Sequence, residues 1–138
     1  SRVPLLSNLE AHQVADIMQL LHARNFPPKA EIVPKGAHGD AMYFVASGKV
    51  EHVYPGGSTI YEAGEFFGAR VMLDGAVHPG AYLAAGRARL LKLHKEDFHQ
   101  IELRHPHVAA HIRKAAAGLL RQSDFTGAHM RADETALT

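Results

Sequence analysis

Residues 36–50, with the sequence GAHGDAMYFVASGKV, decide the fold. An apolar run over residues 41–45 lies between two glycine-containing turns, which is the pattern of a strand bounded by turns. Glycine at such corners supplies a positive φ or lets strands approach closely, and Asp40 can hydrogen-bond the turn backbone. Because side chains alternate across a strand, we expect two opposite faces: Tyr43 and Val45 on one, Met42 and Phe44 on the other.

The same pattern of short strands and turns extends from residue 31 to residue 94. Short apolar runs alternate with turns that contain glycine, proline or aspartate; the runs are residues 31–33, 41–45, 49–54, 58–61, 80–84 and 88–93. Many short strands at regular spacing are typical of a β-sandwich or barrel. Residues 69–73 contain no turn former, so we expect one or two helical turns there.

Helical patterns flank this region on both sides. A helix is predicted over residues 7–24, with Ser7 and Glu10 as a capping box and one apolar face made of Val14, Ile17, Met18 and Leu21. Pro27 and Pro28 forbid its continuation. After residue 94 a short helix is predicted over residues 95–103, and Pro106 begins another with an apolar stripe at Val108, Ile112, Ala115 and Leu119.

Composition narrows the class of protein. The chain has 138 residues, 46% of them hydrophobic and 21% charged, which is typical of one soluble globular domain. A formal charge of +1 argues against bulk electrostatic binding to nucleic acid. The absence of cysteine excludes disulfides and thiol catalysis, and no Walker loop or nucleophile elbow is present. No apolar run reaches the roughly 20 residues of a membrane helix.

Two further patterns allow more than one interpretation. His107 and His111 are spaced so that they could share a metal ion, but no third ligand accompanies them, and a solvated face is favoured. A basic surface near the C-terminus could meet anionic lipid, nucleic acid or an acidic partner; it comprises Arg104, Arg113, Lys114 and Arg121. A solvated face is again favoured, because cations near a helix C-terminus suit the macrodipole.

Taken together, these residues resemble the cyclic-nucleotide-binding domains of ion channels, sodium/proton exchangers, kinase regulatory subunits and catabolite-activator-type regulators. The resemblance covers about residues 3–122 and is most specific at residues 36–50, 61–68 and 73–75. It implies an α+β fold: an eight-stranded, jelly-roll-like β-roll with one N-terminal helix, a short cassette helix and two C-terminal helices. We expect the domain to occupy residues 1–123, followed by a disordered tail over residues 124–138.

The resemblance also implies a ligand-binding cassette at Phe67, Gly68, Ala69, Arg70, His78 and Pro79. Relatives carry a Glu directly after Phe-Gly for the ribose, an Arg nine residues later for the phosphate, and then a Ser or Thr. Here these positions hold Ala69, His78 and Pro79. We therefore expect binding of cAMP or cGMP to be weak or absent. A cation could be restored at the phosphate position in two ways, by protonation of His78 or by Arg70 swinging inward. We expect Arg70 to point to solvent instead.

The function implied is that of a regulatory, ligand-sensing domain without catalytic, metal or cofactor sites. We expect it to be the cytoplasmic domain of an inner-membrane ion channel or cation/proton antiporter, cut from a longer protein, since the chain begins at Ser1 in mid-pattern. Its partners would be cAMP or cGMP, the rest of the parent protein and a second copy in a homo-oligomer, but no nucleic acid. The alternative is a ligand-independent interaction or oligomerisation module that kept the fold and lost nucleotide binding. A transcription factor would need a DNA-binding segment before Ser1.

Overall fold

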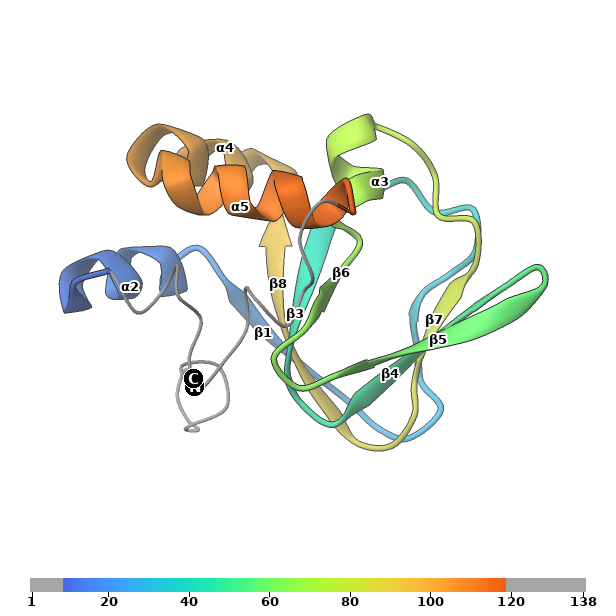
Figure 1. The fold of residues 1–138 in the computed structure, drawn as a ribbon. Coiled ribbons are helices and arrows are strands. Elements are labelled where there is room, and N and C mark those ends of the chain that lie inside the picture. Colours follow the sequence, from blue (N-terminus) through green and yellow to red (C-terminus); the bar gives the residue numbers. More distant parts are fainter. Residues whose placement is uncertain (1–8, 119–138) are drawn as a thin grey trace.

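Two four-stranded antiparallel sheets form a β-roll in the computed structural model, which describes residues 9–118 (Figure 1). The first sheet has the order β1 (His22–Phe26), β8 (Ala88–His94), β3 (Ala41–Ser47) and β6 (Phe66–Phe67). The second has the order β2 (Glu31–Val33), β7 (Ala81–Ala84), β4 (Lys49–Tyr54) and β5 (Gly57–Glu62). Each of the six predicted runs corresponds to a strand, although Gly80 of the run 80–84 lies just before β7, and the predicted eight-stranded α+β roll is confirmed.

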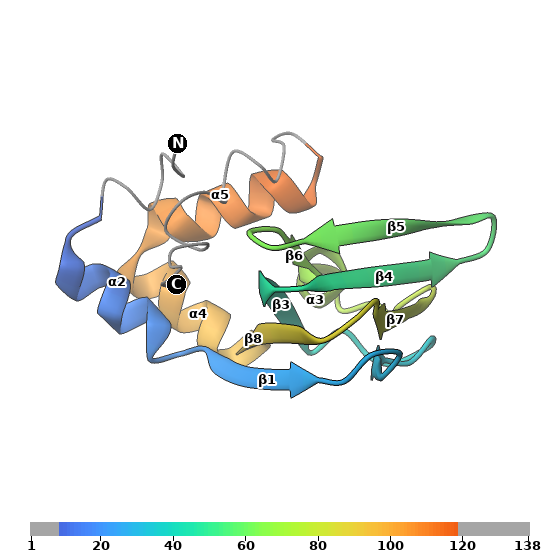
Figure 2. The same cartoon turned by 90° about the horizontal axis from the view of Figure 1, so that it is seen from below.

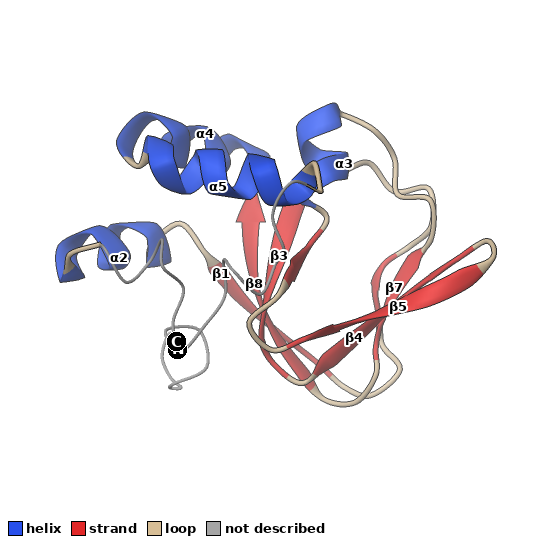
Figure 3. Ribbon diagram, viewed as in Figure 1, coloured by secondary structure: helices blue, strands red, loops and turns tan. Residues whose placement is uncertain are grey.

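Helices gather at one end of the roll, and the β4–β5 hairpin projects from the opposite end in both views (Figures 1 and 2). In the part of the chain that the structure describes they are α2 (Ala11–Met18), α3 (Ala69–Asp74), α4 (Lys95–Arg104) and α5 (Pro106–Ala116). The predictions of a short helix at residues 69–73 and of two C-terminal helices are confirmed (Figure 3). None of the helices within residues 9–118 has both the length and the apolar character needed to cross a membrane.

The β3 strand separates two apolar cores, as its alternation predicts. Met42 and Phe44 face the helices and pack with a cluster that includes Phe98, Ile101 and Ile112. Tyr43 and Val45 face the interior of the roll, where a second cluster includes Val50, Phe67, Tyr82 and Leu90. One strand therefore supplies a wall to both cores.

The N-terminal prediction was wrong in its extent. The helix α2 ends at Met18, and residues 22–26 form β1, which pairs along its whole length with β8, from His22 opposite Lys92 to Phe26 opposite Ala88. Tertiary pairing thus overrides the local helical pattern after Gln19. Glu10 is itself the N-cap, and its backbone amide donates to the Gln13 side chain at 2.9 Å. Ser7 lies outside the described residues.

Ion pairs tie the helices together. The Asp16 carboxylate of α2 accepts hydrogen bonds at 2.9 Å from Arg104, at the end of α4, and at 2.9 Å from the ring of His105, which joins α4 to α5. The Arg113 guanidinium of α5 donates to the Glu102 carboxylate of α4. The two Asp16 bonds hold α2 against the junction from which α5 begins, and the Arg113 bond holds α5 against α4.

The predicted apolar stripe of the last helix is confirmed at its described positions. Val108 and Ile112 are 2% and 1% exposed, and Ala115 is also buried. Leu119, the predicted boundary at residue 123 and the predicted disorder over residues 124–138 lie outside the described residues.

Candidate ligand-binding site

A cavity of about 200 Å³ lies where the roll meets α3 and α5. Its walls come from the end of β5, from β6 and the start of α3, from β7 and from the last turn of α5. The lining residues are Tyr61, Phe66, Phe67, Gly68, Ala69, Arg70, Val71, Tyr82, Ala115 and Ala116. Thus α5, which follows all eight strands in sequence, closes one side of a cavity that the roll and α3 form.

The chain enters α3 through Gly68. Its φ of 85° lies in the left-handed region, which glycine adopts more readily than any other residue. Ala69 follows as a buried side chain at the first helical position. The first amides of a helix have no intrahelical partners, and at this point Ala69 and Arg70 line the cavity.

A stack of aromatic rings fills the interior of the roll beside this cavity. The Tyr82 ring lies between His52, with ring centroids 3.9 Å apart and planes 2° apart, and Phe67, at 4.4 Å and 17°. Phe67 in turn stacks on Tyr43 at 5.1 Å. We call Tyr43, Phe67, Tyr82 and His52 the aromatic stack. It bridges the two sheets, since the first two residues belong to one sheet and the last two to the other.

His78 lies beneath the entrance to α3 and does not line the cavity. Its ring is 2% exposed, approaches the edge of the Tyr82 ring at 5.4 Å, and sits beside Gly68. Its backbone is held by two hydrogen bonds, from its own amide to the Ala37 carbonyl at 2.9 Å and from the Gly36 amide to its carbonyl at 2.9 Å. Its Nδ1 atom has no hydrogen-bond partner among the described residues.

Burial keeps this imidazole neutral. Desolvation lowers the pKa of His78, the neighbouring His52 lowers it further, and the Asp40 carboxylate partly opposes the two. Desolvation also lowers the pKa of His52, and a hydrogen bond with the backbone of Gly80, which raises that pKa, offsets only part of this effect. In the conformation described, His78 therefore offers no positive charge near neutral pH.

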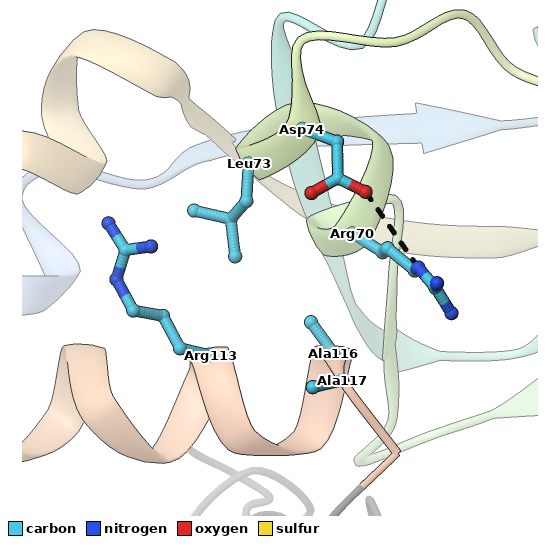
Figure 4. A pocket seen from close by; sticks show the side chains of 6 residues that line it. All are labelled: Arg70, Leu73, Asp74, Arg113, Ala116 and Ala117. Atoms are coloured by element: carbon cyan, nitrogen blue, oxygen red, sulfur yellow. Dashed lines mark ion pairs between the residues drawn. The ribbon is translucent and has the colours of Figure 1, made fainter.

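Arg70 lines the cavity, but most of its side chain is open to solvent. Its side chain is 76% exposed and its Nε atom lies 3.8 Å from the Asp74 carboxylate one turn later. Figure 4 shows the Arg70 side chain turned toward Asp74 and away from Arg113 across a neighbouring surface pocket. This is the solvent-facing orientation that the sequence predicts for Arg70.

Residues 23–105, more than half of the chain, match the family model described as the cyclic nucleotide-binding domain. The chain belongs to this family. This match confirms the resemblance inferred from the sequence. Cyclic nucleotide-binding domains are regulatory ligand-binding modules.

Relatives and solved structures agree. Cyclic nucleotide-gated potassium channels from Rhizobium etli and Mesorhizobium japonicum are each 33% identical over 114 residues, which is 83% of this chain and 32% of each channel. The chain thus spans about a third of the length of these relatives. The crystal structure of the Thermus thermophilus catabolite activator protein matches with a TM-score of 0.73 and 31% identity, covering 88% of this chain and 60% of that one.

The structure separates the predicted cassette positions of this cyclic nucleotide-binding domain into two groups. Phe67, Gly68, Ala69 and Arg70 line the cavity. His78 lies buried behind Gly68, and Pro79 is exposed. No cationic side chain is directed into the cavity from the positions where the resemblance places the ribose and phosphate anchors.

Sequence reasoning missed the aromatic residues of the roll interior, His52, Tyr61 and Tyr82. A signal for two of them was available in the strand alternation: His52 follows the buried Val50 by two residues, and Tyr82 precedes the buried Ala84 by two. Their stacking was not accessible, because it depends on β4 pairing with β7, which places His52 opposite Tyr82.

The other candidate signals lead to no site. Within residues 9–118, no group of three or more histidine or acidic side chains could hold a metal ion, and His107 is exposed. Two members of the basic surface already have partners, Arg104 with Asp16 and Arg113 with Glu102. Arg121 lies outside the described residues.

Proposed function

We propose that this cyclic nucleotide-binding domain senses a ligand for a larger membrane protein, an ion channel or cation/proton antiporter of the bacterial inner membrane, and acts from its cytoplasmic side without catalysis. The channels of Rhizobium etli and Mesorhizobium japonicum, which are 33% identical to the chain, support the assignment to a channel. The output would run through α5, whose Ala115 and Ala116 close one side of the cavity. A ligand that draws α5 further over the cavity would shift the domain between two conformations, one with α5 closed over the cavity and one with it open.

We further propose that cAMP and cGMP bind weakly or not at all. The observation that carries this is the lack of a charged side chain at both anchor positions: Ala69 stands at the position of the ribose anchor, and His78, buried and with a lowered pKa, stands at the position of the phosphate anchor. A charge-assisted hydrogen bond contributes ~1.5–3 kcal/mol. The loss of two weakens binding by ~3–6 kcal/mol, or on the order of 10² to 10⁴-fold, so a micromolar site becomes nearly millimolar.

Calorimetric titration with cAMP and with cGMP tests this proposal. We expect no dissociation constant tighter than ~100 µM for the natural chain. The variant Ala69→Glu/His78→Arg should bind at least one nucleotide more tightly. The matched control, Ala110→Glu/His107→Arg, makes the same changes at exposed positions of α5 and should bind no better than the natural chain. A low-micromolar constant for the natural chain would refute weak binding.

The alternative is an interaction module that no longer responds to nucleotide. The aromatic stack supports it, because side chains of the chain itself fill the interior of the roll. Under this alternative the Ala69→Glu/His78→Arg variant also fails to bind, while sedimentation of the natural chain reports a dimer or larger assembly that neither nucleotide alters.

A further inference from the structure

The central ring of the aromatic stack belongs to Tyr82. It is 4% exposed and has a ring on each face, His52 at 3.9 Å and Phe67 at 4.4 Å, with the His78 ring at its edge at 5.4 Å. The Tyr61 ring lies 6.3 Å away on the cavity side. Tyr82 is thus held from several directions by side chains of four different segments.

The backbone of Tyr82 is held as firmly as its ring. Tyr82 pairs with His52 of β4 on one side and with Val33 of β2 on the other, so β7 is a central strand. Two residues earlier, a Cβ atom at Gly80 would collide with the Val53 carbonyl, which shows how closely β7 approaches β4. Neither the strand nor the ring can move aside without disturbing its neighbours.

The Tyr82 ring borders a cavity that is small for the nucleotide ligands that name this family. Tyr82, Phe67 and Tyr61 are, with Phe66, the aromatic residues that line the cavity of about 200 Å³. Pockets for drug-sized ligands span ~300–1,000 Å³. On the side of Tyr82 and Phe67, the cavity ends against the aromatic stack.

We propose that Tyr82 is the specificity-determining residue of this site and limits it to ligands smaller than a purine nucleotide. The proposal rests on the proposed function, since it concerns the same cavity, but its origin is steric and is independent of the missing charges at Ala69 and His78. A nucleotide can enter fully only when the Tyr82 ring leaves its place between His52 and Phe67.

A series of side chains at position 82 tests the proposal with cAMP as the probe. Tyr82→Val and Tyr82→Leu both remove the ring, and Val leaves more free space than Leu. Tyr82→Phe retains the ring as the matched control. The series is made in the natural chain and again in the Ala69→Glu/His78→Arg chain. Affinities are measured by nuclear magnetic resonance titration, and the fold of each variant is checked by far-ultraviolet circular dichroism.

We expect the affinity to rise in the order Tyr and Phe, then Leu, then Val, with Val about tenfold tighter than Phe, since displacing a ring from two stacked partners has an effect of that size. If Val does not fold, Leu against Phe gives the same comparison with a smaller cavity. Equal affinities for Phe, Leu and Val in both chains would overturn the proposal and leave the proposed function standing. Low-micromolar binding by the natural chain would instead refute weak binding and show that the Tyr82 ring is no barrier.

Discussion

Acidification should destabilise this domain through His52 and His78. Both rings are buried, 8% and 2% exposed, and desolvation lowers the pKa of each below its usual value. Above that usual value of ~6.5 both imidazoles are neutral in the folded and unfolded chain and contribute no pH dependence. Below it the unfolded chain binds protons that the folded chain excludes, so stability falls as the pH falls.

The size of the effect follows from the number of protons. Each histidine that stays neutral when folded and is protonated when unfolded lowers the free energy of unfolding by at most ~1.4 kcal/mol per pH unit, so the two together set an upper limit of ~2.7 kcal/mol per unit. The carboxylates with lowered pKa values, Asp16 and Glu102, begin to lose their stabilising effect at about pH 5, where the unfolded chain starts to protonate them, so they interfere little between pH ~5.5 and ~6.5.

Urea denaturation between pH ~5 and ~8 measures this slope directly. His78→Gln and His52→Gln should each reduce it, and because the two imidazoles lower one another's affinity for protons, the effects should not be strictly additive. The control His107→Gln removes an exposed imidazole of α5 and should leave the slope unchanged. A double variant with the same pH slope as the natural chain would refute the burial argument.

Two further predictions concern the helices. Ile112→Ala should lower the free energy of unfolding by ~2–5 kcal/mol in urea denaturation, because Ile112 is 1% exposed in the core between α5 and the first sheet; a loss below ~1 kcal/mol would contradict that packing. Asp16→Asn should make the amides of α5 exchange with deuterium faster, because the Asn side chain has one acceptor oxygen and no charge where Asp16 accepts from both Arg104 and His105; unchanged exchange would mean that the Asp16 bonds do not hold the junction.

Local patterns predicted the fold wherever a side chain's environment follows from its neighbours in sequence. The alternation of Met42, Tyr43, Phe44 and Val45 specified both faces of β3, because the strand has a different core on each side. The absence of turn formers after Gly68 predicted α3 in the same way. These inferences needed no knowledge of which strands pair.

The errors arose where distant segments decide the structure. Residues 22–26 form a strand because β8 offers them a partner 62 or more residues later in the chain, as in the pairing of Phe26 with Ala88. For His78, sequence reasoning weighed a protonated ring as a phosphate ligand. In the conformation described, burial and His52 both lower the pKa of His78 and so disfavour the charged form; its role toward a ligand stays a prediction. The stacking on Tyr82 likewise required the β4–β7 pairing.

The division of β3 between two cores has a consequence for how such a domain can diverge. Ala41, Tyr43 and Val45 belong to the inner cluster, whereas Met42 and Phe44 belong to the helical cluster, with Ala46 packed against it. Within β3, substitutions that change the interior of the roll therefore fall on different residues from those that change its contacts with the helices. If the domain senses a ligand as proposed, these two sets of residues can change separately, so a lineage could alter or abandon its ligand while the packing of β3 against the helices persists.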